Sequence, residues 1–489
     1  MKHLILRYTM LKNHVNQIFT KKIKININTL FPLCIFSSLY SSSFGLIPYL
    51  DGGIDFVKSF DFFSGGFKKL FQNWVSVHPP GKEFISLLLF STLGINKFSY
   101  SLIGLVFGII GIILFHQFVL KLSDKKIANF ASILLAANPL FISVGIFSLT
   151  DYLLAIFVIG SFYFYLERKW FLMTIFLSFA FLTKETGILC SISIGLVELT
   201  LNNKKLIKKR VLFLKFLASI LFPFLLFLIW YLFLKLHSKP FWTDWNFSET
   251  SSKGSLYTII HNILSFSFLN KYAYQNWLHL FFLNFNWVYW LLIIVGLLIF
   301  IRKTLKNKRY TKITKSEKTK LSITLFFLFY NVIALSYQTF TIPRYILPCV
   351  PILILWVSSS IKTITKFLKI KNFYLYLIVP IFSINAVSLF FSLDPISSRV
   401  WGKEKIYGEE IYSLRKHLAG NDGITYNLQY VTITRRRTKD ILNSAKSGNI
   451  ISSDCSWIFP DPRNDKRILQ ALKINIDIEK PCFNIGYLR

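Results

Sequence analysis

The sequence predicts an all-α protein that crosses a membrane many times and ends in a small α/β domain. Of its 489 residues, 53% are apolar and only 16% are charged, whereas an average soluble domain has about 25% charged residues. The charges are clustered between long apolar runs, and Phe alone occurs 51 times. These features exclude a soluble globule, a coiled coil, a disulfide-rich miniprotein and a disordered chain.

Eleven stretches without Asp, Glu, Lys or Arg predict eleven transmembrane helices, because a span needs about 20 mostly apolar residues. A further run, residues 84–96, is too short to span, so we expect an interfacial or re-entrant helix in the first outer loop. The eleven predicted spans are 25–50, 98–120, 127–150, 152–166, 170–183, 186–197, 216–234, 272–301, 321–343, 345–361 and 372–393.

The distribution of basic residues predicts the orientation. With a cytosolic N-terminus, the inner segments carry 30 Lys and Arg and the outer loops between spans carry 11, as expected when positive charge stays inside. We therefore expect a multi-pass protein of the plasma or inner membrane. Its parts are a cytosolic basic tail (1–27), a membrane domain (28–393) and an extracytoplasmic domain (394–489). The net charge of +34 is spread between apolar runs, so no nucleic-acid partner is expected.

The polar C-terminal segment contains the alternating stretch Ile424–Ile433, typical of a strand, and a helical pattern at Ile468–Ile474. Cys455 and Cys482 are the only cysteines in this segment. Because an exported compartment permits disulfides, their location predicts a bridge. The alternative is two unpaired thiols.

Ionisable residues gather at the predicted outer ends of the helices, where they are candidates for chemistry. A carboxylate there can accept a hydroxyl proton, and Lys or Arg can neutralise a phosphate. These residues come from four separate loops: Asp51, Asp55, Asp61, His78, Glu83, Asp151, Lys184, Glu185 and Arg344.

Each candidate also has a purely structural interpretation. Asp151 could be only a favourable charge at a helix N-terminus, and Lys184 and Glu185 could pair with each other. Asp51 could be a turn residue, His78 an ordinary loop residue and Arg344 an interfacial anchor. Asp55 and Asp61 could be solvated carboxylates.

Several of these residues lie in short motifs that occur in a fixed order. The motifs are Asp51-Gly52, His78-Pro79-Pro80, Ser148-Leu-Thr-Asp151, Leu182-Thr-Lys184-Glu185-Thr-Gly187, Pro343-Arg344-Tyr345 and Asp394-Pro395. Together they resemble polyprenyl-phosphate-sugar-dependent membrane glycosyltransferases of the C fold type. That superfamily includes protein O-mannosyltransferases and aminoarabinose transferases. The resemblance covers about residues 25–400.

The resemblance implies an inverting transfer of a sugar from a polyprenyl-phosphate donor to a hydroxyl of a protein, lipid or glycan at the outer face. It implies that Asp51 is the general base. The family often has Asp-Glu where this chain has Asp51-Gly52, which leaves Asp55 as an alternative. Lys184, Arg344 and Tyr345 would bind the donor phosphate.

The remaining acidic and imidazole side chains have less defined roles. Asp151 is a further catalytic candidate, and His78, Glu83 and Glu185 are candidates for binding the acceptor or a divalent cation such as Mg²⁺ or Mn²⁺. No cofactor is certain from the sequence. Alternative functions are a polymerase or ligase of lipid-linked saccharides, a non-enzymatic flippase or transporter, and a membrane anchor for the exported domain.

The predicted orientation can be tested with single cysteines introduced at Lys303, His78 and Trp457 after the native cysteines are replaced. A membrane-impermeant thiol reagent added from outside should label positions 78 and 457 and leave 303 unlabelled, since the basic loop around Lys303 is expected inside. Labelling at 303 without labelling at 78 would contradict the orientation.

Overall fold

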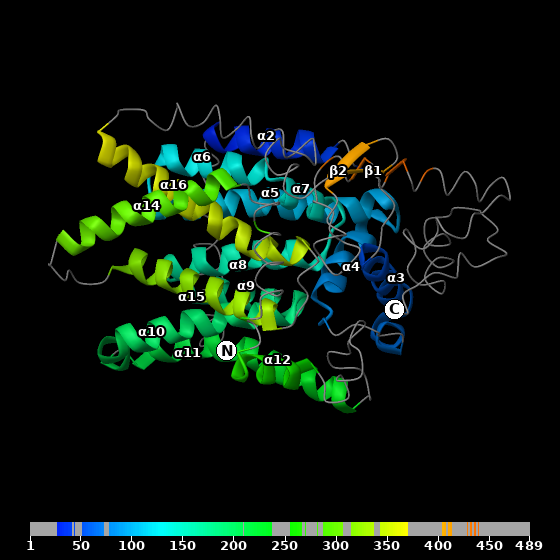
Figure 1. Cartoon of the computed structure of the whole chain (residues 1–489). Helices are drawn as coiled ribbons and strands as arrows, with labels where there is room; N and C mark the ends of the chain where they lie inside the picture. The colour runs from blue at the N-terminus through cyan, green and yellow to red at the C-terminus, as the bar shows by residue number, and fades with distance from the viewer. Residues whose placement is uncertain are drawn as a thin grey trace, which may run out of the picture.

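The computed structural model describes residues 27–41, 44, 51–72, 78–208, 210–236, 255–266, 269, 281, 287–306, 314–336, 343–369, 403–406, 409–412 and some positions between 428 and 439. Its long helices run side by side, and α3 and α4 lie together at one end of the bundle (Figure 1). The elements are α2 (Ile27–Ser41), α3 (Asp51–Gln72), α4 (Gly81–Leu93), α5 (Lys97–Leu122), α6 (Lys125–Ala136), α7 (Pro139–Ile146), α8 (Thr150–Leu166), α9 (Trp170–Thr183), η1 (Glu185–Gly187), α10 (Ile188–Lys208), α11 (Arg210–Leu236), α12 (Ser255–Leu264), α14 (Trp287–Lys306), α15 (Lys315–Ser336), η4 (Pro343–Cys349), α16 (Val350–Leu368), β1 (Lys403–Ile406) and β2 (Glu409–Tyr412).

Within this described part, four helices are long and apolar enough to cross a membrane, and the bent pair α6–α7 makes a fifth candidate. Shorter apolar helices coincide with other predicted spans, among them Thr150–Leu166 and Trp170–Thr183. The chain is thus a multi-pass membrane protein. The total of eleven spans stays a prediction, and its last run, 372–393, lies outside the described residues. The four long candidates are Lys97–Leu122, Phe213–Phe233, Lys315–Ser336 and Arg344–Leu368.

The predicted span over residues 127–150 is present as a bent pair of helices and not as one straight helix. The run is divided into α6 and α7, whose axes differ by 50°. Pro139 occupies the first turn of α7, and the side chain of Asn138 accepts a hydrogen bond from the Phe141 amide at 2.9 Å. A proline lacks the amide that would continue α6, and an Asn cap starts a new helix.

The segment between the first two predicted spans is largely helical. The predicted helix in residues 84–96 is present as α4, with 13 residues. Helix α3 was not predicted, and it bends at Gly65 and Gly66, where Gly66 adopts φ 59°. Only glycine takes this left-handed conformation at little cost. Both helices pack on the end of the bundle, where α4 contacts α3, α5 and α9.

Helix α8 is the centre of the bundle, because 14 of its 17 residues are buried. It contacts α5, α9, α15 and η4. Its sequence carries almost no polar side chain between Asp151 and Tyr165 except Ser161, whose hydroxyl donates to the Phe157 carbonyl at 2.8 Å. A helix that is apolar on all sides is expected to be buried on all sides.

Helix α5 approaches its neighbours closely at Gly104 and Gly108. A Cβ atom at Gly104 would overlap the carbonyl oxygen of Gly145, and one at Gly108 would overlap Phe36 and the Tyr152 hydroxyl. The Tyr152 hydroxyl donates to the Gly104 carbonyl at 3.0 Å. This GxxxG pair therefore acts as a helix-packing motif.

In the described portion of the C-terminal segment, β1 and β2 form an antiparallel pair with Lys403 opposite Tyr412. The strand expected at Ile424–Ile433 was wrong at positions 428, 431 and 432, which are helical. Their apolar spacing fits a helical face as well as an alternating one, and Leu428 and Val431 are buried in the main core. The predicted domain as a whole remains untested, and Cys455 and Cys482 lie outside the described residues.

We expect Gly104→Ala to lower the thermal unfolding temperature in detergent, since overpacking a tight helix contact costs about 1–3 kcal/mol. Gly195→Ala in α10 is the matched control. Its new Cβ would meet only Ile220 at 3.5 Å, so replacing a helical glycine there should stabilise by roughly 0.5–1 kcal/mol. Equal shifts in the two variants would contradict the close packing at Gly104.

Candidate functional site

Asp151 in the first turn of α8 holds two cations from distant parts of the chain. Lys184 Nζ lies 2.6 Å from Asp151 Oδ1, and Arg344 Nε lies 3.4 Å from Asp151 Oδ2. The Asp151 side chain is 1% exposed, while those of Lys184 and Arg344 are 7% and 13% exposed. The expected proximity of Lys184 and Arg344 is therefore present, and we call these three residues the Asp151 triad.

The Asp151 triad has one negative and two positive side chains, so it carries a net charge of +1. Tyr345 lies beside both cations, with its ring centroid 4.1 Å from Lys184 Nζ and 5.2 Å from Arg344 Cζ. Burial opposes the charge on Lys184, but Asp151 outweighs it and raises the pKa of this ammonium. A buried positive site of this kind favours an anion.

Next to the triad, His78 Nδ1 lies 2.7 Å from Glu185 Oε2. Burial would raise the pKa of Glu185, but His78 and Lys184 lower it to about 2, so this carboxylate is charged at neutral pH. Lys184 and Glu185 thus bind Asp151 and His78, respectively, and the alternative that they only pair with each other was wrong. The alternative that His78 is an ordinary loop residue is also wrong, because His78 contacts Glu185.

A second buried cluster joins α3, α4 and α5. Lys82 Nζ lies 2.8 Å from Asp55 Oδ2, and Lys58 Nζ lies 3.2 Å from Asp55 Oδ1. Burial raises the pKa of Asp55, but Lys82 and Lys58 more than offset this and lower it below its usual value. Burial also raises the pKa of the adjacent Glu83 to about 7, although Lys58 opposes the shift.

The expectation that Asp55 and Asp61 are solvated was wrong. Asp55 is 6% exposed and Asp61 is 2% exposed. The sequence could not place them because the helix that buries them, α3, lies in a stretch interrupted by charges. Buried carboxylates require partners, and the i, i+3 spacing of Asp55 and Lys58 is the one local signal that could have indicated a pair.

Asp51 begins α3. The next residue, Gly52, has no side chain and so allows α3 to approach the turn before α8 closely. A Cβ atom at Gly52 would lie 2.8 Å from the carbonyl oxygen of Phe147 and 3.7 Å from Leu149 Cδ2. The turn 147–149 ends two residues before Asp151. The first turn of α3 therefore packs against the segment that supplies Asp151, although the two are about 100 positions apart in the chain.

The candidate cation ligands do not assemble into a three-ligand group. His78 and Glu185 pair with each other, whereas Glu83 lies in the other cluster, with Asp55 and Lys58. No three His, Cys, Asp or Glu side chains among the described residues are placed to hold a metal ion. These donors do not fit a metal centre, and we derive no chemical step through one.

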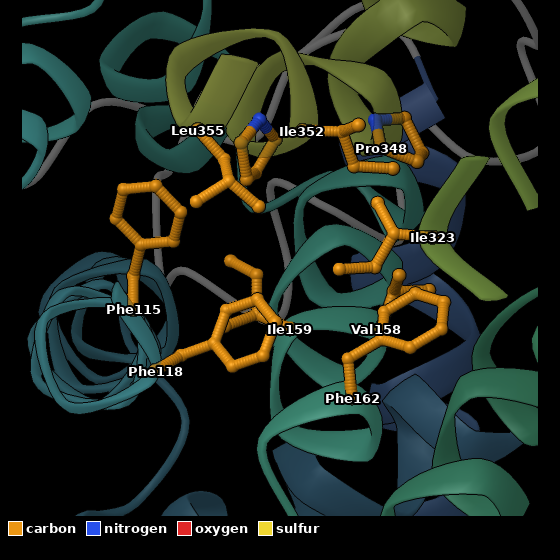
Figure 2. Close-up of a pocket in the computed structure, with 10 residues that line it drawn as sticks. Phe115, Phe118, Val158, Ile159, Phe162, Ile323, Pro348, Ile352 and Leu355 are labelled. Carbon is orange, nitrogen blue, oxygen red and sulfur yellow. The ribbon is translucent and has the colours of Figure 1, made fainter. Parts of the chain in front are cut away.

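A separate small apolar pocket lies between α5, α8, α15, η4 and α16 (Figure 2). Its walls contain no charged side chain, so it is distinct from the Asp151 triad, and Pro348 lies one turn beyond Arg344. Its lining residues are Phe115, Phe118, Val158, Ile159, Phe162, Ile323, Pro348, Pro351, Ile352 and Leu355.

Residues 77–230 match the family described as dolichyl-phosphate-mannose-protein mannosyltransferase. The predicted resemblance is confirmed over this stretch. The matched region contains His78, Asp151 and Lys184, and it ends before Arg344. No curated protein matches the chain in sequence.

Solved structures of two proteins also resemble the chain. ArnT from Cupriavidus metallidurans bound to undecaprenyl phosphate is 14% identical with a TM-score of 0.45, and the match covers 68% of this chain and 60% of that one. AglB, the oligosaccharyltransferase of Archaeoglobus fulgidus, in complex with an inhibitory peptide and a dolichol-phosphate, is 10% identical with a TM-score of 0.46, over 94% and 61% of the two chains. The chain thus spans about 60% of the length of each.

Proposed function

We propose that this chain is a membrane glycosyltransferase that moves a sugar from a polyprenyl-phosphate donor to an acceptor hydroxyl. The observation that carries the proposal is the Asp151 triad, in which two buried cations share one carboxylate, an arrangement that favours a phosphate. Two of its members, Asp151 and Lys184, lie in the stretch that matches the mannosyltransferase family. The ArnT structure is bound to undecaprenyl phosphate, and the AglB structure is in complex with a dolichol-phosphate.

The proposed triad acts by preorganisation. Asp151 fixes Lys184 and Arg344 in place before any ligand arrives, so little reorganisation is needed when negative charge develops on the leaving phosphate. Tyr345 covers the two cations on one side. The acceptor oxygen attacks the anomeric carbon, the bond from that carbon to the phosphate oxygen breaks, and the electron pair stays on the lipid phosphate.

The base that takes the hydroxyl proton is proposed to be Asp51. Asp55, the alternative, has Lys82 on one carboxylate oxygen and Lys58 on the other. A carboxylate held in this way has a low pKa, which reduces the driving force for proton transfer to it. Asp51 lies one helical turn before Asp55 on α3, and its neighbour Gly52 approaches the segment leading to Asp151.

We further propose that the reaction takes place at the outer face, with inversion at the anomeric carbon. In this arrangement the N-terminus is cytosolic, residues 28–393 form the membrane domain, and residues 394–489 lie outside the plasma or inner membrane. The acceptor is a protein, lipid or glycan hydroxyl. His78, Glu83 and Glu185 would then position the acceptor, because they lie at the same end of the bundle as the triad.

The alternatives differ in what they require of the site. A polymerase or ligase would use a pyrophosphate-linked donor, and its second phosphate would call for further cations. A flippase would need a polar path through the bundle, and among the described residues the small pocket between α5, α8 and α16 is lined by apolar side chains (Figure 2). These contrasts favour transfer from a lipid monophosphate donor.

To test the reaction and its base, membranes containing each variant are given a panel of radiolabelled polyprenyl-phosphate sugars. Asp51→Asn should lower transfer by on the order of 10²–10⁴, the usual contribution of a general base, and Asp55→Asn should lower it less. Asp61→Asn, from the same helix, is the matched control. Wild-type activity in Asp51→Asn would refute the assignment, and the reverse ranking would transfer the role to Asp55.

To test the phosphate site, Lys184→Ala and Arg344→Ala are compared with the double variant in the same assay. Each single change should reduce donor use by on the order of 10²–10³, and the combined loss should be less than additive because both residues act on one anion. Lys121→Ala, which breaks the more exposed pair with Glu167, controls for the loss of a cation. Strict additivity would argue against a shared phosphate.

A further inference from the structure

A chain of buried polar contacts leads from Asp55 to the first turn of α3. Lys82 Nζ, which binds Asp55, also donates to the Tyr100 hydroxyl at 2.9 Å. The Tyr100 hydroxyl in turn donates to the carbonyl oxygen of Gly52 at 2.9 Å. The contacts thus end on the residue next to Asp51.

This chain of contacts is buried from one end to the other. Lys82 is 0% exposed and Tyr100 is 2% exposed, and the Lys82 ammonium also lies 5.3 Å from the centre of the Tyr100 ring. A buried lysine is expensive to desolvate and is kept where it has a defined task. Here Asp55 balances the charge of Lys82. Lys82 in turn orients the Tyr100 hydroxyl, which donates to the Gly52 carbonyl.

On its other side, the same turn of α3 rests against the carbonyl of Phe147. Gly52 is therefore held from two directions, by the Tyr100 hydroxyl of α5 and by the turn that precedes Asp151. The first turn of a helix frays unless other groups fix it. These two contacts fix it where the proposed base is attached.

We propose that Lys82 and Tyr100 are positioning residues, which clamp the first turn of α3, where Asp51 begins the helix, against the turn that precedes Asp151. This inference rests on the proposed function of Asp51 as the base. It assigns Asp55 a role as the anchor of Lys82. Neither Lys82 nor Tyr100 need touch the substrate in this arrangement.

The decisive variant is Tyr100→Phe, which removes one hydroxyl and keeps the ring and the Lys82–Asp55 pair. Its matched control is Tyr40→Phe. The Tyr40 side chain is as buried as that of Tyr100, and its hydroxyl donates to the main-chain carbonyl of Ser101 in α5 at 2.6 Å. Hydrogen exchange of peptides covering residues 51–58 measures the clamp directly. Steady-state transfer with varied donor measures its effect on the reaction.

We expect exchange in residues 51–58 to be at least about threefold faster in Tyr100→Phe and unchanged in Tyr40→Phe, because only the first frees this turn to open. The kcat should fall about tenfold with the donor KM unchanged, since a misplaced base loses rate while the phosphate site is intact. Lys82→Met should act in the same direction.

Unchanged exchange in Tyr100→Phe would overturn the inference whatever the activity, and so would an unchanged kcat. Equal effects of Tyr100→Phe and Tyr40→Phe on kcat would mean that the Tyr100 hydroxyl contributes only to general packing. That result would also overturn the inference. A wild-type chain that transfers no sugar from any donor of the panel would instead overturn the proposed function. The clamp would then be judged by exchange alone.

Discussion

A charge buried in an apolar bundle needs a partner, and the structure depends on how this requirement is met at Asp151. An isolated carboxylate inside the bundle would cost several kcal/mol of desolvation. Lys184 and Arg344 offset that cost from two directions. Lys184 follows the last residue of α9 and Arg344 lies in the first turn of η4, so one buried carboxylate ties two separate chain segments to the end of α8.

The same requirement is met at the opposite end of α8. Glu198 of α10 accepts a hydrogen bond from Tyr165 at 2.6 Å and pairs with Arg168 at 2.8 Å. The Arg168 guanidinium lies over the rings of Tyr165 and Trp170. The central helix is therefore anchored by ionic contacts at its two ends and by apolar packing between them. This arrangement suits a helix that must not slide within its bundle.

The sequence predicted the long apolar helices that the structure describes, because each leaves a direct composition signal, a run without charges. It also identified Asp151, Lys184 and Arg344, since a charge at the edge of such a run is conspicuous. It failed for Lys82 and Tyr100, which resemble an ordinary loop cation and a helix-end aromatic. Their importance comes from contacts across 18 to 48 positions, and no local pattern reports such contacts. Helix α3 was missed for a related reason, as its burial comes from tertiary packing and not from its own composition.

The break between α6 and α7 has a geometric consequence for the whole site. Helix α7 has eight residues, so it is a rod of about 12 Å at 1.5 Å per residue. Turning a rod of that length through 50° moves its far end by about 10 Å relative to a straight continuation of α6. The bend at Asn138–Pro139 therefore sets the direction of α7, and the Phe147 carbonyl directly after α7 lies close to Gly52. Two residues outside both charged clusters thus influence where the first turn of α3 meets the turn before α8.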